Sequence, residues 1–176
     1  MIEKIITYAL IAISVSLALA YLKKGATTKF FLTGSGKLIL RMNKLYAVMG
    51  LIGFILGLFI TIMIVITKGP LLVAAIVLII FWGTGIPCWI YYRNHILKFD
   101  DKAIEVKSFY GKDGSILWSD ISDISFNHFS GLLTILDNKG IIIKIHQHIV
   151  GLSSFVKMLE QKTSWTAEKL RMPIAK

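Results

Sequence analysis

The side chains best suited to chemistry are three histidines in the C-terminal half, His128, His146 and His148. His146 and His148 are two residues apart, so they would share one face of an extended strand, and histidine is a common zinc ligand. However, Gln147 between them is not a usual ligand, and no carboxylate follows at helical spacing. We therefore interpret all three as surface histidines and predict no metal site.

Two pairs of aspartates could serve as a general acid and a general base. Asp100 and Asp101 fall in a predicted hairpin turn, whereas Asp120 and Asp123 flank a predicted strand, so neither pair has a clear catalytic setting. The sequence contains no glycine-rich phosphate loop, nucleophile elbow or catalytic Cys–His pattern. The single cysteine, Cys88, excludes an intrachain disulfide and a zinc site built on several cysteines. We predict that the protein is not an enzyme and has no cofactor.

Two long apolar segments dominate the chain and must position everything else. Residues 45–67 and 71–92 contain no Asp, Glu, Lys, Arg or His, and only Lys68, Gly69 and Pro70 separate them. A helix needs roughly 20 consecutive apolar residues to cross a hydrocarbon layer of about 30 Å. The pattern predicts an antiparallel transmembrane hairpin over residues 45–92.

A third apolar segment, residues 5–22, is also just long enough to cross a bilayer. The small residues Ala18 and Ala20 would also fit the cleavage site of a signal peptide. The preceding residues are barely basic, and Lys23 and Lys24 follow directly, as they do after a membrane anchor. We interpret residues 1–22 as an uncleaved helix and predict three transmembrane helices in total.

Basic residues are concentrated beside these apolar segments. The chain has 176 residues and a formal charge of +10; residues 1–95 hold nine Lys and Arg against one acidic residue, and residues 96–176 hold eleven against nine. This distribution favours contact with anionic headgroups over nucleic-acid binding, which we do not predict. The predicted membrane-surface residues are Lys23, Lys24, Lys29, Lys37, Arg41, Lys44 and Arg93.

The same charges predict an orientation. The basic loop of residues 23–44 contains no acidic residue, whereas the tip of the hairpin carries one lysine. By the positive-inside rule, the loop is cytoplasmic, the N-terminus lies outside, and the C-terminal part lies in the cytoplasm. We expect a multi-pass membrane protein.

The basic loop itself has two interpretations. Residues 28–33 are rich in strand formers, and residues 37–42 place apolar side chains between basic ones. The loop is either a strand that joins the C-terminal sheet, followed by an interfacial segment, or a linker whose lysines touch headgroups.

Small residues in the hairpin predict close helix packing. Gly53 and Gly57 lie on one face of the first helix, and such residues let helix backbones approach each other in lipid. Packing within the hairpin and a homodimer seam are both open, and Pro87 should kink or end the second helix. With few polar groups in these segments, we expect an anchor. The predicted packing residues are Gly50, Gly53, Gly57, Gly83 and Gly85.

The C-terminal part has the alternation of short strands. Six strands joined by hairpin turns predict an antiparallel meander. Helical periodicity follows, with Ser153 as N-cap and an apolar stripe to about residue 162. The predicted strands are residues 96–99, 103–109, 115–118, 121–127, 132–136 and 141–145, and the stripe comprises Leu152, Phe155, Val156 and Leu159.

This arrangement resembles the pleckstrin-homology (PH) superfold, and bacterial PH-like domains that follow a transmembrane hairpin in particular. The resemblance covers residues 28–162 and rests on Ile104-Glu105-Val106, on residues 116–121 with Ile124, and on residues 150–152 with Phe155. It implies an antiparallel β-sheet or barrel closed by a C-terminal helix, which a strand before the hairpin can complete. The Trp118-Ser119-Asp120-Ile121 motif is interpreted as structural, because a buried Trp and a turn Asp stabilise a fold.

Inositol-lipid binding is not carried over from the resemblance, since the first predicted hairpin, at Asp100-Asp101-Lys102, is acidic at its tip.

The sequence therefore predicts an α+β membrane protein with three transmembrane helices and a cytoplasmic β-domain. The resemblance implies that this domain is PH-like and that the protein lies in a bacterial inner membrane. We expect a non-catalytic interaction module that binds a protein or peptide partner, or the membrane surface, at the cytoplasmic face; a homo-oligomer is open. The alternative is a small immunity protein, inhibitor or accessory subunit that acts on another membrane protein through its spans. The predicted boundaries are residues 1–22, 23–44, 45–92, 93–163 and a tail at 164–176.

Overall fold

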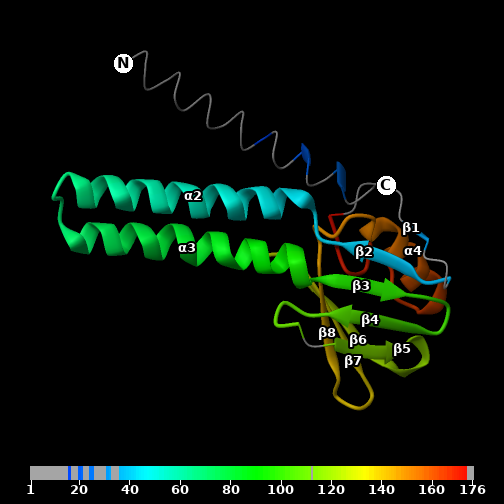
Figure 1. The fold of residues 1–176 in the computed structure, drawn as a ribbon. Coiled ribbons are helices and arrows are strands. Elements are labelled where there is room, and N and C mark those ends of the chain that lie inside the picture. The colour runs from blue at the N-terminus through cyan, green and yellow to red at the C-terminus, as the bar shows by residue number, and fades with distance from the viewer. Residues whose placement is uncertain are drawn as a thin grey trace.

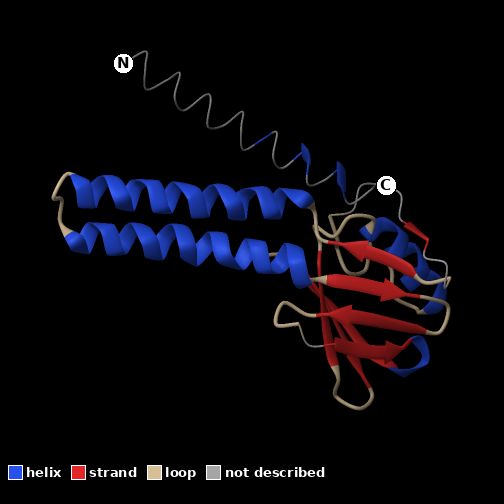
Figure 2. Cartoon of the chain, viewed as in Figure 1, coloured by secondary structure: helices blue, strands red, loops and turns tan. Residues whose placement is uncertain are grey.

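A long helical hairpin projects from a small β-domain in the computed structural model of the chain (Figure 1). The structure describes residues 16, 20–21, 24–25, 31–32, 36–111 and 113–173. Its architecture is mixed α+β, with antiparallel sheets and a short helix at the far side of the domain (Figure 2). Most of the first predicted span, residues 1–22, lies outside the described residues; within the described residues, two helices are long and apolar enough to cross a membrane.

The predicted pair of apolar helices is confirmed. Helix α2 covers Lys44–Ile66 and helix α3 covers Leu71–Asn94. Asn43 caps α2, because its Oδ1 accepts a hydrogen bond from the Leu45 amide at 2.9 Å. At 1.5 Å per residue the helices are about 35 Å long, enough to cross a hydrocarbon layer of about 30 Å. Most of their large apolar side chains are exposed and are not covered by the core of the β-domain.

The two helices approach closely where glycines face each other. A methyl group added to Gly50 would lie 2.8 Å from the Gly85 carbonyl oxygen, and one added to Gly57 would lie 2.7 Å from Phe81 Cβ. A methyl group added to Gly53 would lie 3.4 Å from the Gly85 Cα. These contacts lie within the hairpin, as one of the two interpretations of the glycines has it.

One detail of α3 differs from the expectation: Gly83 faces open space, with nothing within 4 Å of an added methyl group, so it does not contribute to helix packing. At Pro87, where a kink or an end of the helix was expected, the structure excludes the end, because α3 continues to Asn94. Beyond Pro87, Tyr91 and Tyr92 pack against the β-domain core.

The β-domain consists of two antiparallel sheets that are not closed into a barrel. One sheet has the order β1-β2-β3-β4-β5 and the other β6-β7-β8. The strands are β1 Phe31–Leu32, β2 Leu38–Arg41, β3 Ile96–Phe99, β4 Ala103–Lys107, β5 Asp113–Leu117, β6 Ile121–Asn127, β7 Leu132–Asp137 and β8 Ile142–His146.

The predicted single meander is therefore wrong at one point, between β5 and β6. A 3₁₀ turn, Trp118–Asp120, separates these strands. The Trp118 side chain is buried, and its indole N–H donates a hydrogen bond to the Asp100 carbonyl at 2.8 Å. This contact fixes the turn at which the chain leaves the first sheet, and β6 is the first strand of the second sheet.

The segment before the hairpin completes the first sheet. Strand β2 lies antiparallel to β3, with Leu40 opposite Leu97, and β1 pairs with β2. The interfacial segment expected over residues 37–42 is thus a strand, because Leu40 and Met42 are buried in the domain core. The strand expected over residues 28–33 is described only at Phe31–Leu32.

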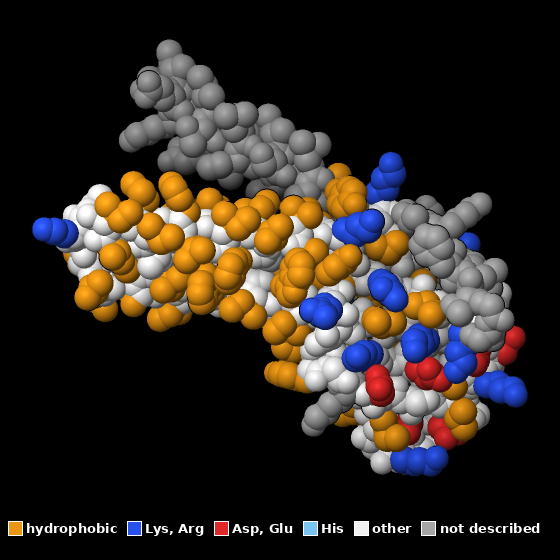
Figure 3. All heavy atoms as spheres, in the orientation of Figure 1, with side chains coloured by type: hydrophobic (Ala, Val, Ile, Leu, Met, Phe, Trp, Pro, Cys, Tyr) orange, Lys and Arg blue, Asp and Glu red, His pale blue; other side chains and the backbone are white. Residues whose placement is uncertain are grey.

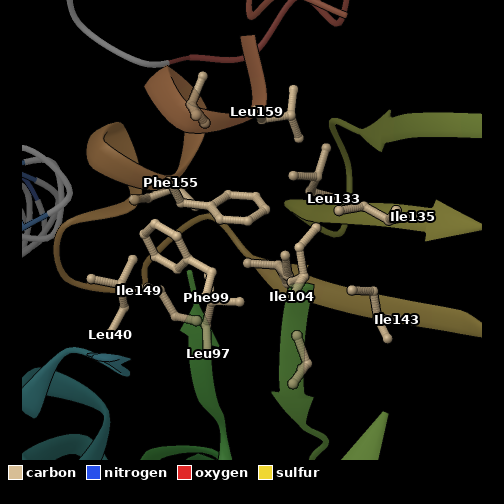
Figure 4. Packing of buried hydrophobic residues seen from close by; sticks show 14 of the residues in the cluster. Leu40, Leu97, Phe99, Ile104, Leu133, Ile135, Ile143, Ile149, Phe155 and Leu159 are labelled. Atoms are coloured by element: carbon tan, nitrogen blue, oxygen red, sulfur yellow. The ribbon is translucent and has the colours of Figure 1, made fainter. Parts of the chain in front are cut away.

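Helix α4, Leu152–Lys162, packs its predicted stripe into the core formed by the two sheets (Figure 4). The Phe155 ring meets Phe99 edge-on at 5.2 Å and stacks on Trp118 at 5.8 Å. The helix begins after Gly151, whose φ of 82° suits glycine, so the prediction of Ser153 as N-cap is wrong. Beyond α4, Leu170 and Met172 are buried, which means that the expected tail packs onto the domain.

Gly85→Leu should destabilise the hairpin, because the side chain has no room beside Gly50 and overpacking typically costs about 1–3 kcal/mol. Gly83→Leu, the same change two residues earlier, should cost little, since Gly83 faces open space. Thermal unfolding in detergent micelles, followed by helical circular dichroism, measures both. Equal losses would contradict the described packing.

Trp118→Phe should lower the free energy of unfolding of the β-domain by about 1–3 kcal/mol, because the Asp100 carbonyl loses its indole donor. The matched control is Trp89→Phe, whose indole lies on the exposed face of α3. Urea titration monitored by circular dichroism of the sheet compares the two. An unchanged midpoint in Trp118→Phe would show that the hydrogen bond does not hold the corner between the sheets.

Candidate functional site

The hairpin and the β-domain meet with almost no linker between them. Strand β2 ends at Arg41 and α2 begins at Lys44, while only His95 separates α3 from β3. The connecting residues are buried: Asn43 and His95 are each 2% exposed. Met42, between Arg41 and Asn43, forms an antiparallel bridge with Ile149. The helices are therefore fixed to the sheets by packed connections.

Three histidines gather at this junction, from two segments of the chain. His95 follows α3, His146 ends β8, and His148 lies in the turn after it. The His146 amide donates to His95 Nε2 at 3.2 Å, and the His148 amide donates to His146 Nδ1 at 3.2 Å. The interpretation of His146 and His148 as surface histidines is wrong, because both are partly buried here.

Two tyrosines from the hairpin close over the histidines. The Tyr46 hydroxyl lies 2.7 Å from His148 Nδ1, which ties α2 to the turn after β8. The Tyr91 ring lies 5.4 Å from His95 and 5.6 Å from His146, edge-on to both. We call these five residues, Tyr46, Tyr91, His95, His146 and His148, the junction cluster.

Burial keeps the junction histidines neutral. It lowers the pKa of His95 to about 4, and the Lys107 backbone offsets this only in part. Burial, together with the nearby His148 and His95, lowers the pKa of His146 to about 4. Because His95 Nε2 accepts a hydrogen bond from the His146 amide, the proton of the neutral His95 ring sits on Nδ1.

The contacts in the junction cluster form a joint between the hairpin and the β-domain. The junction histidines face aromatic rings and backbone groups, and no group of three or more His, Cys, Asp or Glu side chains in the described part of the chain is placed so that it could hold a metal ion. His128 lies apart from the cluster, exposed and edge-on to Phe126 at 5.0 Å. The cluster can therefore hold the hairpin and the β-domain in one relative orientation.

The predicted membrane-surface residues divide into two groups. Lys37 pairs with Glu105 at 2.6 Å and lies 3.8 Å from Asp100, so it neutralises acidic groups on the sheet. Arg41, Lys44 and Arg93 are exposed beside the junction. Figure 3 shows the contrast between the apolar surface of the hairpin and the basic side chains where it meets the domain. Lys24 is exposed, and Lys23 and Lys29 lie outside the described residues.

The Trp118-Ser119-Asp120-Ile121 motif lies in the corner between the sheets. Trp118 is a core residue and Ile121 packs against that core, whereas the Asp120 carboxylate accepts from Ser119 Oγ at 2.9 Å. The turn role expected for Asp120 is filled by Asp137, which is buried and accepts from the Lys139 and Ile141 amides at 2.8 and 2.7 Å. The sequence signal for this role was the turn Asp137-Asn138-Lys139-Gly140, whose first residue is an aspartate.

Sequence reasoning missed the junction cluster. No contact was predicted from the sequence for Tyr46, Tyr91 or His95. Comparison of the chain with models of protein families, with curated proteins and with solved structures finds no match. A function for this chain must therefore be argued from its own geometry.

Acidification should destabilise the junction cluster. The pKa values of His95 and His146 are about 4 in the folded protein, below the ordinary 6.5, so unfolding takes up protons between these values. Stability is complete above pH 6.5 and falls as the pH drops toward 4. At pH 5 the loss should be about 1–2 kcal/mol for each histidine.

Thermal unfolding at pH 7.5 and pH 5 measures this loss. His146→Gln should reduce the difference between the two pH values, and the exposed control His128→Gln should leave it unchanged. An identical pH dependence in the wild type and His146→Gln would contradict the assignment.

Proposed function

We propose that this protein is a non-catalytic, membrane-anchored interaction module. The hairpin of α2 and α3 tethers a PH-like domain to the cytoplasmic face of a bacterial inner membrane, where the domain binds a protein partner. Support for the anchor comes from two helices of membrane-spanning length with exposed apolar side chains. Support for the orientation comes from exposed Arg41, Lys44 and Arg93 at one end, against Lys68 at the hairpin tip.

The observation that carries the binding proposal is the free edge of β6. This strand has seven residues and pairs with β7 on one side, while no other strand among the described residues pairs with its second side. Its exposed side chains are small or polar, including Asp123, Ser125 and Asn127. An extended peptide can add to such an edge through main-chain hydrogen bonds, a mode that needs no catalytic group.

A PH-like assignment for the domain is supported by its strand-rich architecture and by α4, which covers the core. The separation of the strands into two sheets at Trp118–Asp120 fits a sheet that bends at a corner.

A photo-crosslinking side chain at Ser125 tests the proposal in native membranes. It should form a discrete protein adduct, and the matched control at Lys139, an exposed turn residue between β7 and β8, should not. Asp123→Pro should abolish the adduct, because proline removes a backbone N–H from the edge strand. Circular dichroism checks that this variant keeps its fold. Absence of a specific adduct at Ser125 would contradict peptide binding at β6.

A second function is favoured by a groove on the hairpin. A cavity of about 300 Å³ is lined by Gly50, Leu51, Phe54, Gly85, Ile86 and Trp89. Such an apolar groove could receive a helix of another membrane protein, as an immunity protein or accessory subunit would require. A crosslinker at Leu51 that captures a protein, while Ser125 captures none, would favour this alternative.

A further inference from the structure

The length of the hairpin places one end of the β-domain in the headgroup layer. Helices of 23 and 24 residues span about 35 Å, only slightly more than the hydrocarbon thickness of about 30 Å. Only Met42, Asn43 and His95 separate these helices from β2 and β3. We call the end of the domain that carries these connections the near end. Any loop at the near end must lie close to lipid if the hairpin spans a membrane.

The turn between β4 and β5 lies at the near end. Lys107, the last residue of β4, pairs with Ile96, the first residue of β3. Beyond it, the Phe109 carbonyl accepts from Asn94 Nδ2 at 3.0 Å, and the Phe109 ring lies 5.1 Å from Tyr91. The next residue, Tyr110, is 83% exposed. The turn is therefore fixed to the end of α3 and leaves one aromatic side chain uncovered.

The turn between β6 and β7 reaches the near end as well. Leu132 pairs with both Asn127 and His146, and the His146 amide donates to His95, directly after α3. Within this turn, Asn127 Oδ1 accepts from the amides of Phe129 and Ser130 at 2.9 and 3.0 Å. Phe129 is fully exposed, at 102%. An ordered turn thus holds a large apolar side chain away from the protein.

Basic side chains accompany these aromatics. Arg41, Lys44, Arg93 and Lys107 are exposed at the near end, and Asp113 is the acidic residue paired with Lys107 across the strands. Aromatic rings favour the boundary between headgroups and hydrocarbon, and each Lys or Arg near an anionic surface contributes about 1 kcal/mol. The combination is complementary to a bilayer that contains anionic phospholipid.

We propose that the near end is a membrane-contact surface, in which Phe129 and Tyr110 enter the headgroup layer and the four basic residues bind anionic phospholipids. This proposal rests on the proposed anchoring by the hairpin. The surface lies at the end of the hairpin opposite its tip. The β-domain is therefore held flat against the membrane, which fixes the direction in which the β6 edge faces.

A depth measurement on the full-length protein tests this surface. In a Cys88→Ser background, a spin label at Ser130→Cys, beside Phe129, is compared with labels at Lys139→Cys and Ile79→Cys. Nanodiscs contain either phosphatidylcholine alone or a 7:3 mixture with phosphatidylglycerol, and accessibility to oxygen and to a water-soluble nickel complex reports depth. We expect Ser130→Cys at headgroup depth in the mixture, Lys139→Cys in water and Ile79→Cys in hydrocarbon.

Variants resolve which side chains hold the surface down. Phe129→Ser should move the Ser130→Cys label into water. Because the Phe129 side chain is fully exposed, this change should not affect folding, and an unchanged circular dichroism spectrum checks that. Arg41→Gln combined with Lys107→Gln should shift the docked equilibrium roughly thirtyfold toward the undocked state, from about 1 kcal/mol per basic residue. Lys162→Gln, a lysine paired with Asp101 on the domain, is the matched control.

Four outcomes would overturn the proposal. A Ser130→Cys label as accessible as Lys139→Cys, with Ile79→Cys still in hydrocarbon, would leave the anchor and remove the membrane-contact surface. An Ile79→Cys label in water would instead refute the anchor itself. Equal depth in both lipid mixtures would exclude recognition of anionic lipid. Protection that appears only with two proteins per nanodisc would assign the surface to a second copy of this chain.

Discussion

The hydrogen bonds between β2 and β3 constrain the whole molecule. These strands are neighbours in one sheet, yet the entire hairpin lies between them in the chain. If α2 and α3 enter a membrane, they must cross it an even number of times, because both strands have to finish on the same side. A pair of helices joined by a short turn satisfies this requirement directly. The pairing of β2 with β3 and the number of membrane crossings therefore depend on each other, and neither can change alone.

The buried connections between the hairpin and the β-domain also fix the orientation of the two parts relative to each other. Asn43 and His95 replace flexible linkers, and Tyr46 and Tyr91 bring the helices onto the turn after β8. Neutral histidines suit this role, because a charged imidazole would be costly among aromatic rings. The joint thus links the proposed binding edge on β6 to the anchor through packed contacts. A partner captured there would be held at a fixed height and direction relative to lipid.

The sequence predicted those parts of the fold that depend on local patterns. Uncharged runs located α2 and α3, and alternation located six strands to within a few residues, since both signals arise within each element. The rest depends on distant contacts: Leu40 makes residues 38–41 a strand only because Leu97 lies opposite, and Trp118 divides the sheets by reaching Asp100. The junction cluster was missed for the same reason, because nothing near His146 in sequence announces Tyr46 or Tyr91. No sequence motif marked Phe129 and Tyr110 either, since exposure is a property of the folded surroundings.

The uninterrupted passage from α3 into β3 has a mechanical consequence. A helix pair of fixed length responds to a thinner bilayer by tilting, at a cost of fractions of a kcal/mol per ångström of mismatch. A flexible linker would absorb that tilt, but a single buried residue, His95, connects the helix to the strand. If the hairpin spans a membrane, the sheet must then rotate with the helices, so that a change in lipid thickness changes the angle between the domain and the membrane plane.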